Sequence, residues 1–298
     1  MADSLPTKNI FDSHCHIDFI LDRKLKNPSI RTYSRLVEKF PAMQHEKLEG
    51  FITNYCDPST WPELGTAPPA MLTSAWVTNG LSVHYTVGCH PHFAEQLLRK
   101  GAMEALERLL VEGRGRGCVA VGECGLDCSR KNGADMDVQI EAFKLQVKLA
   151  MKLDLPLVLH IRDAEEEGIA VLESCGLPGT WPVHRHCWND SWVRCQTWLD
   201  LFPGSVVGFT GLITYSQADQ AREVARLLPL DRLVLETDAP YFRPQYSGLL
   251  PPDSLRFAHP VQVVSVAAAI AGIKGVSLES VLARCRENVS RVYSIPNI

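Results

Sequence analysis

Histidines and carboxylates recur at or just after the ends of the predicted strands in this 298-residue chain. The set comprises His14, His16, His90, Glu123, His160, His186 and Asp238. Parallel strands of a barrel all open their carboxyl ends on one face, so these side chains are expected to meet there. Imidazole and carboxylate groups gathered at one place predict a site for divalent metal ions.

The histidines show which side chains can share an ion. In the extended sequence HCH, His14 and His16 are two positions apart and therefore point to the same side. His160 ends PLVLH and His186 ends PVHRH, and this matched placement favours ligands over core histidines. His184 has the same two-residue spacing to His186 and is the competing ligand, but His186 is preferred because it is nearer the rim.

Two carboxylates are predicted to be catalytic as well as metal-binding. Glu123 can offer one oxygen to each of two cations and so act as a bridge, although a buried salt bridge is the alternative. Asp238 ends LVLETD before Ala-Pro and can bind an ion and accept a proton from a water. Buried there without a partner, it would cost several kcal/mol or shift its pKa strongly. Glu236 has the same strand parity and could be structural.

The ligand set is too large for a single ion. It contains His14, His16, Glu123, His160, His186 and Asp238. Two divalent ions roughly 3.5–4 Å apart would use all six ligands and would lower the pKa of a shared water towards about 7. The mixed nitrogen and oxygen donors suit Mg²⁺, Mn²⁺ or Zn²⁺, with Mg²⁺ as our first choice.

Two further residues are candidates for substrate binding. His90, in GCHPH, can donate a hydrogen bond to a substrate oxyanion, whereas His92 can be a simple rim residue. Arg162 can bind a phosphate with two parallel hydrogen bonds. It can equally pair with Asp163 or Glu165.

Alternating apolar and amphipathic segments predict the scaffold that holds these groups. Strands are expected at 10–14, 50–55, 83–88, 118–122, 156–160, 182–186, 205–209 and 232–237. Helices are expected at 102–112, from Asp137 as the cap through Leu153, at 192–202 and at 278–293. Asp190 or Ser191 is expected to cap the third helix, and Ser277 the fourth.

Eight such units predict the α/β class and a (β/α)8 TIM-type barrel, with an open doubly wound sheet as the alternative. Residues 1–298 are predicted to form one domain with a short tail at 1–8. The proline-rich stretches 57–69 and 241–254 are predicted to be rim loops.

Composition excludes several classes of protein. No apolar run reaches the roughly 18 residues of a membrane span. The ten cysteines are scattered and form no CxxC pair, which favours a reducing compartment inside the cell, in the nucleus or the cytoplasm. The net charge is −4, whereas proteins that bind duplex nucleic acid over a whole face are usually basic. GxSxG, GxxxxGK[ST] and strand-linked GxGxxG motifs are absent. We expect a monomer.

Six ordered motifs resemble those of the TatD family of metal-dependent nucleases, from about residue 10 to 293. They are FDSHCHID, GCHPH, VGECGLD, HIRDA, HRHCW and LETDAPY. HRHC together with GFTGLITYS at 208–216 looks similar to a vertebrate branch of the family. The resemblance implies a TIM-type barrel with two metal ions that hydrolyses nucleic acid, often as a 3′-exonuclease.

Carried over by motif, the family's ligands match those chosen from the residues. One ion would take His14, His16, Glu123 and Asp238, and the other would take Glu123, His160 and His186. His90 would face a substrate phosphate. Two departures affect the substrate entrance: the family's HCFxG reads HCWND at 186–190, and its Arg-Asn-x-Pro segment reads RFAHP at 256–260. They put the preference between DNA and RNA in doubt.

The leading hypothesis is a metal-dependent hydrolase of ester bonds that acts on single-stranded or frayed ends of DNA or RNA. Four aromatic residues near strand ends can stack bases or pack the rim, namely Trp188, Tyr215, Tyr241 and Phe242. The first alternative is an amidohydrolase-like enzyme that cleaves C–N or C–O bonds of a small metabolite. The second is a non-catalytic binding module.

Overall fold

The computed structural model of the chain describes residues 10–27, 29–65, 69, 72, 80–129, 133–245, 248–296 and 298. Eight strands follow one another around a single sheet, each parallel to the next. They are β1 (Ile10–Cys15), β2 (Leu48–Tyr55), β3 (Ser82–Val87), β4 (Cys118–Asp127), β5 (Leu157–Arg162), β6 (Val183–Arg185), β7 (Ser205–Phe209) and β8 (Leu233–Leu235).

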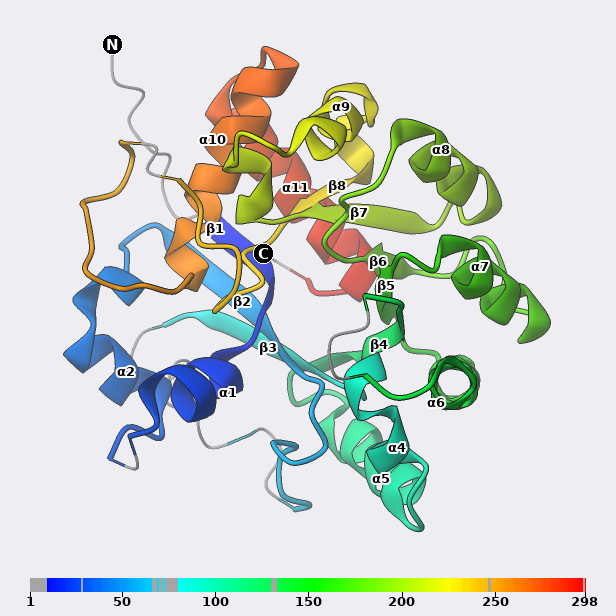
Figure 1. The fold of residues 1–298 in the computed structure, drawn as a ribbon. Helices are drawn as coiled ribbons and strands as arrows, with labels where there is room; N and C mark the ends of the chain where they lie inside the picture. Colours follow the sequence, from blue (N-terminus) through cyan, green and yellow to red (C-terminus); the bar gives the residue numbers. More distant parts are fainter. Residues whose placement is uncertain are drawn as a thin grey trace.

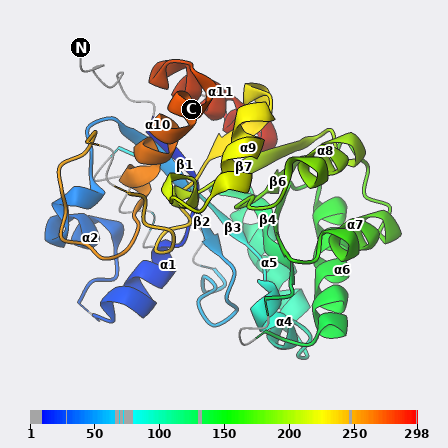
Figure 2. The ribbon, with the colours of Figure 1, turned by 45° about the horizontal axis from the view of Figure 1, so that its top comes forward.

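Helices surround the strands on the outside (Figures 1 and 2). The α-helices described are α1 (Ile17–Phe19), α2 (Tyr33–Lys39), α4 (Ala94–Leu97), α5 (Ala102–Gly113), α6 (Met136–Leu153), α7 (Glu165–Ser174), α8 (Trp192–Leu201), α9 (Asp219–Leu227), α10 (Val263–Lys274) and α11 (Leu278–Tyr293). A π-helix spans Ile20–Leu25, and short 3₁₀ turns lie at Pro41–Met43, Pro91–Phe93, Gly211–Thr214, Leu230–Arg232 and Pro260–Gln262. The predicted barrel is therefore confirmed, and the open doubly wound sheet is wrong.

Two of the predicted helix caps are confirmed and one is wrong. Ser191 accepts a hydrogen bond from Arg194 N, and Ser277 accepts one from Ser280 N. The helix expected to start after Asp137 instead begins at Met136, with Asp135 at the cap position, so Asp137 lies in its first turn. An acidic side chain there still faces the positive end of the helix dipole.

The strands are buried on both faces, as predicted. Inside the barrel, apolar side chains of the strands pack against the end of α11 and the residues after it. This cluster comprises Phe11, Ile52, Ala120, Val158, Val206, Val234, Val289, Val292, Tyr293, Ile295 and Ile298. A larger apolar cluster fills the space between strands and outer helices.

Strand β4 differs most from its prediction. It continues to Asp127, five residues past the expected end, so Glu123 lies within the strand. The pairing of β4 with β5 shifts between Val121 and Cys124, where Gly122 has a φ of 152°. Only glycine adopts this backbone readily, and the irregularity interrupts the regular alternation of side chains.

The first and last strands close the ring. The Asp12 carboxylate accepts hydrogen bonds from Thr237 N at 2.9 Å and Thr237 Oγ1 at 2.6 Å, between residues 225 positions apart. Asp238 N donates to His14 O at 2.9 Å, and His16 N donates to Ala239 O at 2.7 Å. Closure therefore brings the HCH segment next to Asp238.

Both predicted rim loops lack strands and α-helices at their described residues, 57–65 and 69 in the first and 241–245 and 248–254 in the second. Residues 66–68, 246–247 and the tail 1–8 lie outside the described part. Among the described residues no single helix meets the length and hydropathy of a membrane span. Pro260–Lys274 and Leu278–Tyr293 reach them only together, bent by 113°.

Candidate metal centre

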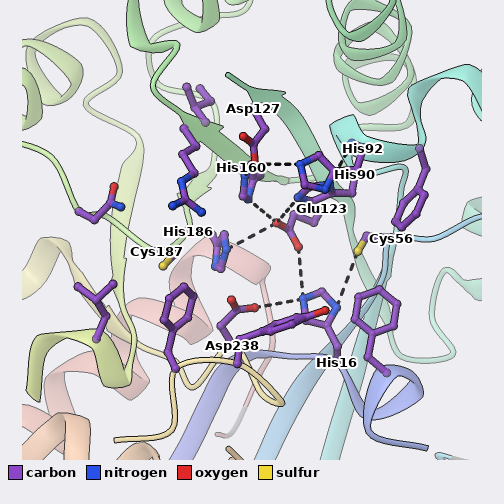
Figure 3. Close-up of a pocket in the computed structure, with 18 of the residues that line it drawn as sticks. His16, Cys56, His90, His92, Glu123, Asp127, His160, His186, Cys187 and Asp238 are labelled. Carbon is purple, nitrogen blue, oxygen red and sulfur yellow. Dashed lines mark hydrogen bonds and ion pairs between the residues drawn. The ribbon is translucent and has the colours of Figure 1, made fainter. Parts of the chain in front are cut away.

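A pocket of about 290 Å³ opens at the carboxyl ends of the strands (Figure 3). Five of the six predicted metal ligands line it: His16, Glu123, His160, His186 and Asp238. His14 is fully buried, with its ring stacked on His186 at 3.9 Å between centroids. The barrel has therefore brought together residues from five strands or strand ends, as the sequence predicted.

Glu123 lies at the centre of this group. Its Oε2 is 3.4 Å from both His14 Nε2 and His16 Nε2. Its Oε1 is 2.9 Å from His160 Nδ1 and 3.6 Å from His186 Nε2. Each oxygen thus faces a different pair of histidines, which is the arrangement that a bridging carboxylate needs.

Asp238 joins the first of these two pairs. Its Oδ1 lies 3.2 Å from His16 Nε2 and 3.6 Å from His14 Nε2. The predicted ligands therefore fall into two sets that share Glu123. The first set is His14, His16 and Asp238, and the second is His160 and His186.

Hydrogen-bond partners indicate which ring nitrogen of each histidine is free to bind an ion. His16 Nδ1 is 2.9 Å from Asn54 O, and a carbonyl can only accept, so Nδ1 carries a proton and Nε2 is the nitrogen that faces Glu123. His160 places Nε2 at 3.1 Å from Asp127 Oδ2, which leaves Nδ1 for the site. The second nitrogen of each ring faces Glu123. Despite burial, Cys56, Asp238 and Glu123 raise the pKa of His16, and Asp127 and Glu123 raise the pKa of His160, so a bound ion would replace a proton on these two nitrogens.

His90 has the opposite arrangement. Its Nδ1 accepts a hydrogen bond from His92 N at 3.1 Å, so the proton of the neutral ring is on Nε2, 3.7 Å from Glu123 Oε1. Burial, helped by the nearby His160, holds the pKa of His90 well below its usual value, so the ring is neutral. His90 is therefore placed to donate a hydrogen bond into the pocket, which suits its predicted role.

The electrostatics of the cluster fit a cation site. Burial would raise the pKa of Glu123, but the surrounding histidines, His186 first, hold it well below its usual range. Burial lowers the pKa of His14 to about 4, so this imidazole is neutral near pH 7. An ionised carboxylate among imidazole nitrogens is a donor set that suits divalent transition metals.

Asp127 is a site residue that the sequence analysis missed. Its Oδ2 is 3.1 Å from both His160 Nε2 and His92 Nε2. His92 is therefore more than a rim residue, because it contacts the carboxylate that orients a predicted ligand. The signal was present in VGECGLD, but the strand was expected to end at residue 122.

The structure also settles the alternatives for several other residues. Arg162 is exposed and lines the pocket, and within the described chain it pairs with neither Asp163 nor Glu165; Glu165 pairs with Arg185 instead. Trp188 is only 2% exposed and packs under Arg185, so it cannot stack on a base. Tyr215 does not line the pocket, and its hydroxyl donates to Arg243 O. Tyr241 and Phe242 do line the pocket.

Gly125 is required for β4 to approach β5 beside two predicted ligands. A Cβ at this position would lie 1.8 Å from His160 O, and the φ of 145° disfavours any other residue. We expect Gly125→Ala to lower the free energy of unfolding by at least about 2 kcal/mol in urea titrations. Gly272→Ala is the matched control, because Gly272 is in α10 with open space around it. Equal stability of both variants would contradict this account.

Residues 11–294 match the family model described as TatD related DNase. The chain belongs to the TatD family. It is 34% identical over 295 residues to the human 3'-5' RNA nuclease TATDN2, across 97% of this chain and 35% of that protein, so it spans about a third of this relative's length. It is 34% identical over 212 residues to the 3'-5' ssDNA/RNA exonuclease TatD of Erwinia billingiae, across 71% and 77% of the two chains.

Solved structures show the same fold. The TatD family hydrolase of Entamoeba histolytica has a TM-score of 0.81 at 20% identity and covers 98% of this chain and 100% of its own. The TatD homologue YjjV of Escherichia coli has a TM-score of 0.75 at 24% identity, with the same coverage. The family and the barrel predicted from the sequence are both confirmed.

Proposed function

We propose that this TatD-family chain is a divalent-metal-dependent nuclease that hydrolyses phosphodiester bonds in single-stranded or frayed DNA or RNA. The main mode would be 3′-exonucleolytic, with endonucleolytic cleavage as a second mode. The observation that carries the proposal is the position of Glu123, whose two oxygens each face a separate set of predicted ligands. The similarity to the human RNA nuclease and to the Erwinia ssDNA/RNA exonuclease supports the substrate class.

The residues present fit two divalent ions. His14, His16, Glu123 and Asp238 would hold one, and Glu123, His160 and His186 would hold the other, with Mg²⁺ as first choice and Mn²⁺ or Zn²⁺ as alternatives. When bound, such a pair supplies an activated water and stabilises negative charge. Asn54 O keeps a proton on His16 Nδ1 and Asp127 keeps one on His160 Nε2, so the other nitrogen of each ring is the one that would bind an ion.

The other side chains of the pocket have separate tasks. The Asp238 carboxylate would accept the proton of the attacking water. His90 Nε2–H would donate to a non-bridging oxygen of the scissile phosphate. Arg162 is exposed at the rim, makes no hydrogen bond or ion pair with its side chain to the described residues, and would bind a neighbouring phosphate. Tyr241, 39% exposed, and Phe242 would stack a terminal base.

We expect Arg162→Ala to raise KM for oligonucleotides about tenfold with little change in kcat, because a charge-assisted hydrogen bond to a remote phosphate acts on ground state and transition state alike. Steady-state kinetics with a fluorescent oligonucleotide measure both constants. Arg108→Ala on the exposed side of α5 is the control and should match the wild type. A fall in kcat with KM unchanged would assign Arg162 to the chemical step instead.

The decisive experiment uses DNA and RNA oligonucleotides labelled at either end, with EDTA or with Mg²⁺, Mn²⁺ or Zn²⁺. A 3′-exonuclease releases the 3′ label at once and shortens the 5′-labelled strand in single-nucleotide steps. A 3′-phosphorylated strand that is still cut internally reveals the endonucleolytic mode. Intact oligonucleotides in every metal, with turnover of a lactone or cyclic amide, would replace the proposal with the small-metabolite hydrolase.

We further propose that the barrel works as one domain and as a monomer inside the cell, in nucleus or cytoplasm. All ten cysteines are free, which agrees with a reducing compartment.

A further inference from the structure

Three buried polar residues lie below His186, deeper in the barrel. They are His184 on β6, Glu236 just after β8, and Tyr293 at the end of α11, and none is more than 3% exposed. His184 and Glu236 do not line the pocket. Buried polar groups are costly unless they satisfy one another, so this cluster needs a reason.

The cluster forms a continuous line from α11 to the pocket. Tyr293 OH lies 2.6 Å from His184 Nδ1, and His184 Nε2 lies 2.9 Å from Glu236 Oε2. On its other side Glu236 Oε1 accepts a hydrogen bond from Cys187 N at 2.6 Å and lies 3.3 Å from His186 Nδ1. The carboxylate therefore contacts the ring nitrogen of His186 that points away from Glu123.

These atoms depend on one another. Within the described part of the chain, Glu236 has the one carboxylate that lies within ion-pair distance of His184 Nε2 and His186 Nδ1. Neither nitrogen has a hydrogen-bond partner among the described residues. The neighbouring strand leaves room for the pair, because a Cβ at Gly208 would lie 2.5 Å from both Glu236 Oε1 and His184 Nε2. Removing Glu236 would leave two buried imidazoles without their carboxylate.

The same arrangement distinguishes the two predicted ligand sets. In the first set, His16 is supported by the neutral carbonyl of Asn54, and His14 Nδ1 has no hydrogen-bond partner in the described residues. In the second set, each histidine contacts a carboxylate behind it, Asp127 for His160 and Glu236 for His186. The first set has Asp238 as an additional direct carboxylate, which the second set lacks.

We propose that Glu236, held in place by His184 and Tyr293, is a positioning residue that orients His186 and sets the affinity of the metal position made by His160 and His186. A carboxylate behind an imidazole fixes the tautomer and makes the ring a stronger donor, and losing such a partner costs roughly 10- to 100-fold in affinity. The carboxylates behind His160 and His186 thus compensate for the missing direct one. The inference rests on the two-ion site of the proposed function.

Metal binding tests the inference without an activity assay. Protein stripped with EDTA is titrated with Co²⁺, followed by its visible absorption and by calorimetry, and the wild type should show two binding steps. We expect Glu236→Gln to weaken one step roughly 10- to 100-fold and to leave the other within about twofold. Glutamine keeps the shape of the side chain and its oxygen can still accept from Cys187 N.

Three further variants test the line of contacts. Tyr293→Phe should weaken the same step by a smaller factor, because His184 loses its support. Gly208→Ala should also weaken that step, since the added Cβ displaces Glu236 and His184 while every titratable group is kept. Tyr33→Phe is the control, because it removes another buried hydroxyl, one that donates to Met43 O at 2.9 Å, and both steps should remain unchanged.

The outcomes separate the inference from the proposed function. If Glu236→Gln binds both ions like the wild type, or weakens both steps equally, Glu236 does not position His186 and the inference is overturned. If the wild type takes up fewer than two ions, the two-ion site itself is wrong. Circular dichroism and thermal melting of each variant show whether the fold is retained.

Discussion

Replacing Glu123 with glutamine is expected to reduce phosphodiester hydrolysis by about 1000-fold or more. The amide has one oxygen and one NH₂ group, so it cannot present an oxygen towards both sets of predicted ligands, and it removes the negative charge between them. The loss should exceed the roughly 10- to 100-fold effect of removing an outer partner of a ligand. Single-turnover cleavage of an end-labelled oligonucleotide at saturating metal measures it.

Glu49→Gln provides a matched control for that variant. Glu49 is also a strand carboxylate, on β2, but it pairs with Arg286 at 2.9 Å and does not line the pocket. Its activity should equal that of the wild type. A folded Glu123→Gln protein that retains full metal-dependent cleavage would refute the proposed mechanism.

Asp238→Asn should lower kcat to a similar extent, about 1000-fold, with the fold intact. The amide is not a base, so it cannot take the proton of the attacking water, and it is a weaker metal ligand. The backbone makes asparagine the right replacement: Asp238 has a φ of 51°, and asparagine tolerates this left-handed conformation better than alanine does. Melting temperature and kcat, measured on one preparation, separate stability from chemistry.

Asp154→Asn tests the backbone part of that reasoning. Asp154 has nearly the same conformation, with a φ of 50° at the end of α6, and it is exposed and does not line the pocket. Both activity and melting temperature should be unchanged. If Asp238→Asn unfolds while Asp154→Asn does not, the Asp238 carboxylate is needed for folding and the catalytic assignment fails.

Much of the site could be predicted from the sequence because parallel strands impose a simple rule. His14, His160 and His186 each came at the end of an apolar segment, and strand ends of a barrel converge whatever their separation along the chain. The register of the sheet did not need to be known. Eight apolar segments in 298 residues were sufficient to choose a closed barrel over an open sheet.

The depth at which a side chain lies inside the barrel, and the irregular backbone of β4, could not be predicted in the same way. His184, on β6, and His186, just after it, have the same parity, and only the structure shows that His184 contacts Tyr293 and Glu236 below the pocket. Asp127 was missed because β4 continues through the shift in pairing beside Gly122. Trp188 follows a strand end, as a stacking residue would, but it turns into the core under Arg185.

The junction between β1 and β8 gives the two proposed cations different relations to the fold. One of them would be held by His14 and His16 from the beginning of the barrel and by Asp238 from its end, across the seam that Asp12 and Thr237 fasten. That cation would link the two ends of the barrel, and its ligands would come together only after β1 and β8 have met. The other cation would be held by Glu123 and by His160 and His186, which lie on β5 and just after the neighbouring strand β6. Metal binding at the first position would therefore show that the barrel has closed.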